Sequence, residues 1–239
     1  MKKGVPNNNR WNVYQDFLEA HGDDYAQVFI TDTRDVIFQG NVFEAFKEQS
    51  SYLGYAAEAD DIRGSKTKDK VNYNWLLKSF GVAEADKLLD KMIICDGTVI
   101  GTPAEIKVFV KKMWELLSAI DKRVNYRIHD QSIANYLIHN NLLPIENLIE
   151  INCESGEILT GSLFWRQHSI DVHGDKVLRG DGEVPAVVHQ YDRRDNAVKL
   201  VDRVYRDKDF RADEKYTDTR SNLEQALQLV FLDKINDAL

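Results

Sequence analysis

The apolar residues of this chain fall into short runs that alternate with amphipathic segments, and this alternation restricts the possible folds more than any other feature. Apolar runs of strand length lie at 27–31, 93–95, 147–152, 157–163 and 185–189. Short apolar runs are typical of buried strands, and strands that alternate with helices are typical of α/β domains. A chain of 239 residues can bury a sizeable core. We therefore expect a single α/β domain over residues 1–239.

Helical periodicity marks the segments between these runs. Residues 11–20 and 73–91 have helical spacing, the second with a break at Gly81, and another helix begins near Asp130. Thr102-Pro103-Ala104-Glu105 is a capping box with proline at the first helical position. It opens a helix that places five apolar residues on one face: Ile106, Phe109, Val110, Met113 and Leu117.

Two less regular regions complete the expected organisation. Residues 36–46 suit a strand, a turn and a short helix, whereas residues 56–71 are polar and charged. We expect 56–71 to be a mobile surface loop that closes as a lid over a bound ligand. The tail at 221–237 has apolar residues at helical spacing, which predicts a C-terminal helical extension at about 207–239.

Composition excludes several classes of protein. The net charge of −8 argues against a general nucleic-acid binder, which needs a cationic surface. No apolar run is long enough to span a membrane, and the first residues do not read as a signal peptide. Cys95 and Cys153 are too few for a disulfide framework, so we interpret them as buried thiols. These observations predict a cytoplasmic protein.

An acidic motif follows the first apolar run. Asp32 and Asp35 lie three residues apart, directly after the expected strand. Divalent cations such as Mg²⁺ and Mn²⁺ prefer carboxylate oxygens and keep positions open for phosphate oxygens. The pair therefore suits a metal that bridges a diphosphate. A solvated turn in which Arg34 pairs with its acidic neighbours explains the same residues.

A histidine and two arginines follow the last apolar run. His189 ends the strand-like segment, and Arg193 and Arg194 come soon after it. A neutral imidazole can bind a metal, and guanidinium groups suit phosphate oxygens. Taken alone, a histidine in this position is more often a core residue that is hydrogen-bonded inside the protein than a metal ligand.

Two further segments are candidates for ligand contacts. Residues 95–102, Cys-Asp-Gly-Thr-Val-Ile-Gly-Thr, form a glycine-punctuated turn before a capped helix, where backbone can approach a ligand. A plain strand–turn–helix connection is the alternative. Asp130 either caps its helix or faces the site, where it would hold or deprotonate a hydroxyl group.

Together, the four segments resemble the GT-A glycosyltransferases. The resemblance rests on Asp32-Thr33-Arg34-Asp35-Val36-Ile37-Phe38-Gln39, on residues 95–102, on Asp130-Gln131-Ser132-Ile133-Ala134-Asn135 and on Val187-Val188-His189-Gln190-Tyr191-Asp192-Arg193. It spans roughly residues 10 to 205. It implies a Rossmann-related, mixed-sheet α/β sandwich that transfers a sugar from a nucleotide-diphosphate-sugar donor to the hydroxyl of a glycan or glycoconjugate acceptor.

The resemblance also implies roles for individual residues. Asp32, Asp35 and His189 would bind Mn²⁺ or Mg²⁺, with Asp35 the safer ligand because Thr33 stands where the common motif has an aspartate. Asp130 and Gln131 would lie at the reacting centre. The donor and acceptor would contact five residues: Arg34, Gly97, Thr98, Gly101 and Arg193.

Two alternatives to sugar transfer by this chain stay open. GT-A enzymes usually begin with a strand–helix–strand unit, and only about ten residues precede the helix at 11–20. We therefore expect part of the N-terminal nucleotide-binding unit to be absent, with a missing segment or a partner chain in its place. A degenerate domain that binds nucleotide-sugar or glycan is the first alternative. The second, a haloacid-dehalogenase-like phosphatase, needs a second aspartate two residues after Asp32, where Arg34 stands.

Overall fold

The computed structural model describes residues 6–65, 70–120, 130–153, 155–160, 171–204 and 230–234. A five-stranded sheet forms its centre, with strand order β10 (Val230–Lys234), β1 (Tyr25–Thr31), β4 (Met92–Gly101), β3 (Leu53–Asp61) and β5 (Leu148–Asn152). The pairs β1–β10, β1–β4 and β3–β4 are antiparallel, and β3–β5 is parallel. The predicted α/β class with a mixed sheet is confirmed.

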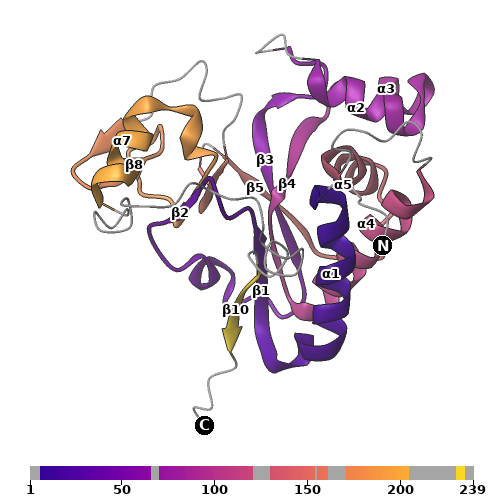
Figure 1. The fold of residues 1–239 in the computed structure, drawn as a ribbon, viewed down its shortest axis with the longest axis horizontal. Coiled ribbons are helices and arrows are strands. Elements are labelled where there is room, and N and C mark those ends of the chain that lie inside the picture. Colours follow the sequence, from indigo (N-terminus) through magenta and orange to yellow (C-terminus); the bar gives the residue numbers. More distant parts are fainter. Residues whose placement is uncertain are drawn as a thin grey trace, which may run out of the picture.

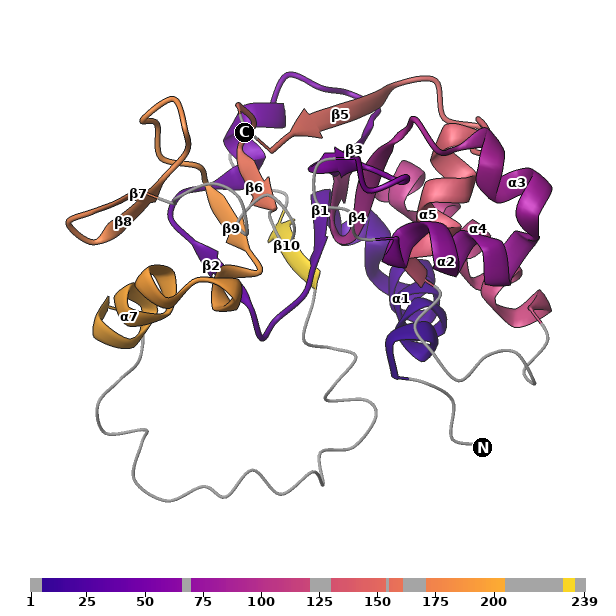
Figure 2. The same cartoon turned by 90° about the horizontal axis from the view of Figure 1, so that it is seen from above.

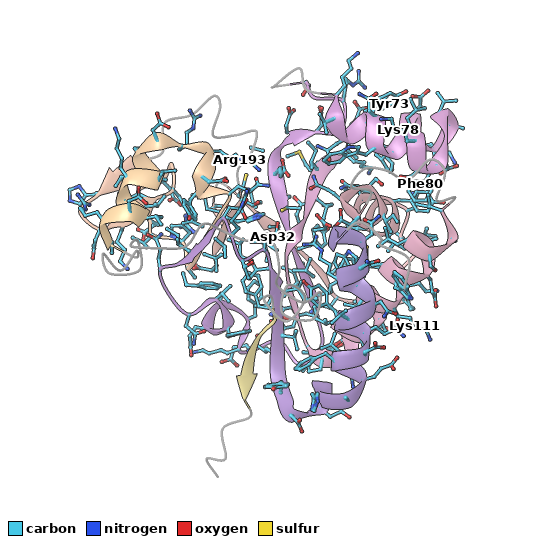
Figure 3. All side chains as sticks on the ribbon, viewed as in Figure 1. Asp32, Tyr73, Lys78, Phe80, Lys111 and Arg193 are labelled. Atoms are coloured by element: carbon cyan, nitrogen blue, oxygen red, sulfur yellow. The ribbon has the colours of Figure 1, made fainter. Side chains whose placement is uncertain are left out.

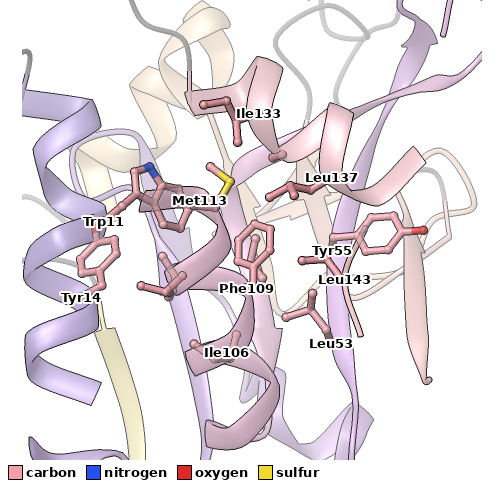
Figure 4. Close-up of a cluster of buried hydrophobic side chains, with 14 of the residues drawn as sticks. Trp11, Tyr14, Leu53, Tyr55, Ile106, Phe109, Met113, Ile133, Leu137 and Leu143 are labelled. Carbon is pink, nitrogen blue, oxygen red and sulfur yellow. The ribbon is translucent and has the colours of Figure 1, made fainter. Parts of the chain in front are cut away.

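Helices cover one face of this sheet (Figures 1 and 2). They are α1 (Pro6–His21), α4 (Pro103–Ala119) and α5 (Asp130–His139), with α2 (Val71–Phe80) and α3 (Val82–Lys87) beside α5. The predicted apolar face of α4 is buried against the sheet, where it meets Trp11 and Leu137 (Figure 4). Gly81, with φ of 85°, separates α2 from α3 as expected from the sequence.

A smaller sheet packs against the other face of the central sheet. It consists of β2 (Val36–Phe38), β9 (Val187–His189) and β6 (Ile158–Thr160), and β7 (Asp171–His173) and β8 (Lys176–Leu178) form a hairpin beside it. Apolar residues such as Phe29, Ile100 and Val187 fill the space between the two sheets. Helix α7 (Asp195–Val204) covers the far side of the small sheet through Leu200 and Val201. Short 3₁₀ helices at Gly22–Asp24, Val42–Phe46 and Tyr191–Arg193 complete the described elements.

Two predictions about secondary structure were wrong. Residues 56–61 belong to β3 rather than to a loop. The charged residues Glu58 and Asp60 made this segment look like an exposed loop in the sequence, but both are buried in the strand. Residues 62–65 form a turn, residues 66–69 lie outside the described residues, and α2 begins at Val71, so both ends of the predicted lid are regular structure. The turn predicted at 95–102 is instead the second half of β4, which pairs with both β1 and β3.

The predicted C-terminal helix is also wrong where the structure describes it. Residues 230–234 form β10, which pairs with the edge of β1. Val230, Phe231 and Leu232 have strand propensity, and the hydrogen bonds of a strand edge outweigh their helical spacing. The rest of the predicted extension lies outside the described residues. Within the part of the chain that the structure describes, no helix has the length and apolar character to cross a membrane.

Candidate metal centre

The turn between β1 and β2 carries both carboxylates of the acidic motif. Asp32 directly follows β1, and its backbone N–H donates to Gly97 O at 3.0 Å. Asp35 directly precedes β2, and its carbonyl accepts from Gln190 N at 2.6 Å. These bonds attach the turn to β4 on one side and to the end of β9 on the other. The backbone therefore fixes the positions of both carboxylates.

His189 completes a cluster with these two carboxylates. It is the last residue of β9 and pairs with Val36 of β2, the residue that follows Asp35. Its Nε2 lies 3.3 Å from Asp32 Oδ2 and 3.8 Å from Asp35 Oδ1. One ligand atom from each of the three side chains lies within 4.8 Å of the others, an arrangement that could hold a metal ion. Figure 3 labels Asp32 at the end of β1, in the region between the two sheets.

Gly97 has no side chain, and this leaves room for the side chains of Asp32 and His189. A Cβ atom at position 97 would lie 2.8 Å from Asp32 Oδ2 and 2.9 Å from His189 Cε1. Real Cβ atoms essentially never approach other heavy atoms this closely, so a larger residue would displace Asp32 or His189. The glycine predicted to allow close approach to a ligand therefore allows close approach of two candidate metal ligands.

A buried arginine joins Asp32 to two further carboxylates. Arg10 of α1 contacts Asp32 Oδ1 at 2.6 Å through Nη1, and Asp96 Oδ2 and Asp130 Oδ2 at 2.9 Å each through Nη2. These groups come from α1, the end of β1, β4 and the start of α5. Asp32 thus contacts both the buried arginine and the histidine of the site, because Oδ1 accepts a hydrogen bond from Arg10 and Oδ2 faces His189.

The pKa values of the carboxylates follow from this arrangement. Burial opposes ionisation of Asp32, but Arg10 and His189 outweigh it and hold the pKa of Asp32 well below its usual range. Burial raises the pKa of Asp35 despite the nearby His189. Burial and the neighbouring Asp130 raise the pKa of Asp96, although Arg10 acts in the opposite direction. One guanidinium therefore does not offset the negative charge of this region.

The charge of His189 depends on the same neighbours. Burial disfavours the imidazolium, but the Cys95 sulfur and the Asp32 carboxylate outweigh burial and raise the pKa of His189. In the metal-free protein, a protonated Nε2 therefore faces Asp32 and Asp35. A divalent cation that took the place of this proton would meet two carboxylate oxygens and one imidazole nitrogen, a donor set that fits such an ion.

Two of the predicted ligand-binding residues lie at the exposed edge of the cluster. Arg34 and Arg193 both pair with Asp192, at 3.2 Å and 3.3 Å. The Arg34 side chain is 79% exposed and that of Arg193 is 47% exposed, so both guanidinium groups are accessible to a ligand. The alternative explanation of the motif paired Arg34 with its acidic sequence neighbours, whereas the structure pairs Arg34 with Asp192.

The helix that begins at Asp130 carries two predicted site residues. Asp130 is buried and, through Arg10, shares a guanidinium with Asp32. Gln131 donates to Asn72 Oδ1 at 2.9 Å and to Glu58 Oε1 at 3.3 Å. Gln131 is thus part of a polar group that extends from the site towards α2 and β3.

Two predicted ligand-binding residues lie within β4 rather than in a turn. Thr98 is fully buried between the strands, opposite Thr31, and its hydroxyl has no hydrogen-bond partner among the described residues. Gly101 pairs with Val28, three residues back along β1 from Thr31. A Cβ at Gly101 would lie 2.6 Å from the Tyr52 carbonyl oxygen. The prediction for both residues assumed a turn, whereas they lie within β4.

The sequence analysis missed Arg10, Asp96, Cys95 and Thr160. Arg10 and Tyr14 are four residues apart, so Arg10 lies on the buried stripe of α1, and a charged residue on such a stripe is a usable signal. Cys95 and Asp96 are consecutive residues of β4, so their side chains point to opposite faces of the sheet. Asp96 therefore contacts Arg10, and Cys95 contacts His189.

A scan against protein-family models and a search of curated proteins found no match for this chain.

Proposed function

We propose that this chain is a metal-dependent glycosyltransferase that moves a sugar from a nucleotide-diphosphate-sugar donor to the hydroxyl of a glycan or glycoconjugate acceptor. The observation that carries the proposal is the convergence of Asp32, Asp35 and His189 beside two accessible guanidinium groups. A carboxylate–imidazole cluster next to cationic side chains suits a metal–diphosphate pair, because the metal and the guanidinium groups then share the phosphate charge.

The proposed cofactor is Mn²⁺ or Mg²⁺, held by Asp32, Asp35 and His189. When bound, this ion would supply positive charge against the diphosphate that leaves as the sugar is transferred. Asp35 is the stronger candidate ligand, because it has no ion pair with Arg10, whereas one oxygen of Asp32 is already bonded to Arg10. Asp32 would contribute its second oxygen, the one that faces His189.

The arginines at the edge of the cluster would bind the donor. Arg193 and Arg34 flank Asp192 and would donate hydrogen bonds to diphosphate oxygens. Charge-assisted hydrogen bonds of this kind are stronger than neutral ones, and they would hold the leaving group in place.

Asp130 would act on the acceptor side of the reaction. Its Oδ2 is held by Arg10, and its ionised form would orient or deprotonate the acceptor hydroxyl. Because the side chain is only 1% exposed, this role requires the acceptor to reach it on opening of the surrounding structure. The Asp130→Asn variant tests it, since loss of transfer with intact donor binding would support the role and unchanged transfer would remove it.

The experiment that tests the function is a turnover assay with a panel of nucleotide sugars. UDP-, GDP- and CDP-sugars are incubated with the protein and Mn²⁺, Mg²⁺ or a chelator, and the released nucleoside diphosphate is measured. We expect release with at least one donor, loss of release with the chelator, and loss of release in Asp35→Asn. Metal-coupled binding of a nucleoside diphosphate without turnover would favour a non-catalytic nucleotide-sugar-binding domain. Absence of both binding and turnover would overturn the proposal.

A further inference from the structure

The nitrogen of His189 that points away from the carboxylates has a partner of its own. Nδ1 lies 2.9 Å from Thr160 Oγ1, while Nε2 faces Asp32. Strands β6 and β9 are parallel, and Thr160 and His189 are register partners, so their side chains project from the same face of the small sheet. Both residues are buried. The strand pairing therefore fixes this contact, which does not depend on a mobile surface side chain.

We propose that Thr160 is a positioning residue that accepts a hydrogen bond from the Nδ1–H of His189 and thereby reserves Nε2 for the metal. This inference rests on the proposed metal centre. A neutral imidazole carries one proton, so a partner that holds the proton on Nδ1 leaves the electron pair on Nε2. The hydroxyl also limits rotation of the ring, which keeps Nε2 directed at Asp32 and Asp35.

Cys95 is the competing partner, because its sulfur lies 3.5 Å from the same nitrogen. The Thr160 contact is at the usual N–H···O distance, and sulfur is a weak acceptor. Both side chains contact Nδ1 and neither contacts Nε2, so they act on the same proton. Thr160 is the stronger acceptor, and Cys95 adds a second, weaker contact on the side of β4.

The first test compares the Mn²⁺ affinity of three variants by electron paramagnetic resonance of free Mn²⁺, alone and with saturating UDP or GDP. Thr160→Val keeps the shape of the side chain but removes the acceptor, and we expect the affinity to fall about ten- to a hundredfold. Thr160→Ser restores the hydroxyl and should restore the affinity. Cys95→Ala should have the smaller effect. Unchanged affinity in Thr160→Val, or a larger loss in Cys95→Ala, would overturn the assignment.

Thr102→Val is the matched control for general loss of stability. Thr102 is a second threonine whose hydroxyl is hydrogen-bonded, in this case to Glu105 at the start of α4, remote from His189. We expect Thr102→Val to unfold more readily than the wild type and to keep wild-type Mn²⁺ affinity. A similar loss of affinity in Thr102→Val and Thr160→Val would show that only stability had changed, and would overturn a positioning role.

A second measurement separates the failure of this inference from the failure of the proposed function. In metal-free protein labelled with ¹⁵N at histidine, the Nδ1–H of His189 should give a resolved, slowly exchanging proton signal that Thr160→Ser keeps and Thr160→Val shifts or loses. A wild-type signal that reports a proton on Nε2 alone would overturn the role of Thr160. Absence of Mn²⁺ binding to a wild-type protein that shows the Nδ1–H signal would overturn the proposed metal function instead.

Discussion

Two buried regions beside the five-stranded sheet are stabilised in different ways. On the helical face, α1, α4 and α5 bury an apolar cluster that includes Trp11, Phe109 and Leu137 (Figure 4). Near the end of β1, the buried groups are instead charged, with Arg10 in contact with Asp32 and two further carboxylates. Apolar burial is non-directional and insensitive to pH, whereas a charged cluster depends on every partner and on every ion present.

This contrast has a consequence for how the molecule can respond to its surroundings. A protonation or a bound cation changes the free energy of the charged region and leaves the apolar cluster as it was. The same Asp32 that Arg10 stabilises also faces His189, so stability and ligand binding are linked through one side chain. Substitutions in the two regions should therefore differ in pH dependence as well as in size.

The largest expected effect is that of Arg10→Met. Removing the guanidinium leaves Asp96 and Asp130 buried without their cation, and loss of one partner of a buried ion pair costs about 3–5 kcal/mol. Arg10 holds the pKa of Asp32 low, so the stability from Asp32 is present above the unfolded pKa and is lost only as pH falls through the folded pKa, which makes this contribution the same at pH 5 and pH 8. The difference between the two pH values comes from Asp96, whose pKa burial and Asp130 raise and Arg10 acts to lower, so in the variant Asp96 gains a proton more readily as pH falls. Its deficit should therefore be larger at pH 8 than at pH 5, as measured by urea unfolding.

Phe109→Ala is the control from the other region. Phe109 is fully buried in the apolar cluster, and a Phe→Ala change costs about 3–5 kcal/mol. We expect its deficit to be the same at both pH values and unaffected by Mn²⁺. If Arg10→Met showed an equal deficit at pH 8 and pH 5, the distinction between the two regions would fail.

Gly97→Ala should have a smaller effect, confined to the charged region. The added methyl group would lie against Asp32 Oδ2 and His189 Cε1, and overpacking of this kind costs about 1–3 kcal/mol. Because two candidate ligands must move apart, we expect weaker Mn²⁺ binding in calorimetry together with the loss of stability. Gly180→Ala is the control, since no atom lies within 4 Å of a Cβ at that position. Wild-type Mn²⁺ affinity in Gly97→Ala would show that the site does not require this close approach.

The predictions that succeeded depended on local periodicity. The apolar runs at 27–31 and 147–152 lie in strands, and the face predicted for the helix after Thr102 is buried. The strand at 53–61 was missed because Glu58 and Asp60 give it the polarity of a loop. β10 was missed because its pairing with β1 joins segments about two hundred residues apart, and helical spacing in the tail carries no information about that pairing.

The site could be predicted only in part, for the same reason. Asp32, Asp35 and His189 were recognised from motifs, and the structure brings them together. Arg10 was not recognised, because its partners lie 22, 86 and 120 residues away in the sequence. Thr98 and Gly101 were predicted in a turn but lie in a strand, since glycine residues inside a strand have the same local pattern as a turn.

The pH dependence of metal binding is the next prediction in order of size. Burial acts to lower the pKa of His189, but the Cys95 sulfur and Asp32 outweigh it, which favours an imidazolium whose Nε2 proton faces Asp32 in the metal-free protein. A cation must displace this proton. Below the folded pKa of His189, the Mn²⁺ affinity should therefore rise about tenfold per pH unit, and above it the affinity should level off.

The linked change in stability has a defined sign. A raised histidine pKa stabilises the metal-free protein below the unfolded pKa, and this contribution is lost as pH rises through the folded pKa. The stabilisation that Mn²⁺ confers should accordingly grow with pH, as followed by thermal unfolding. His139, whose pKa burial lowers, is hydrogen-bonded to the Met92 carbonyl away from the cluster, so His139→Gln should keep the wild-type pH slope. A Mn²⁺ affinity that does not change between about pH 6 and 8 would contradict the displacement of a proton.

The smallest effect on stability is expected at the exposed edge of the charged region, in Arg193→Gln. Arg193 is half-exposed and pairs only with Asp192 among the described side chains, and exposed ion pairs contribute about 0–1 kcal/mol. If Arg193 binds diphosphate oxygens, loss of its charged hydrogen bonds should still weaken binding of UDP or GDP with Mn²⁺ about tenfold in calorimetry. Arg63→Gln removes a similar exposed pair, with Asp90, and should change neither quantity. A loss of several kcal/mol in Arg193→Gln would place Arg193 with Arg10 as a structural residue, whereas unchanged nucleotide binding would remove Arg193 from the donor site.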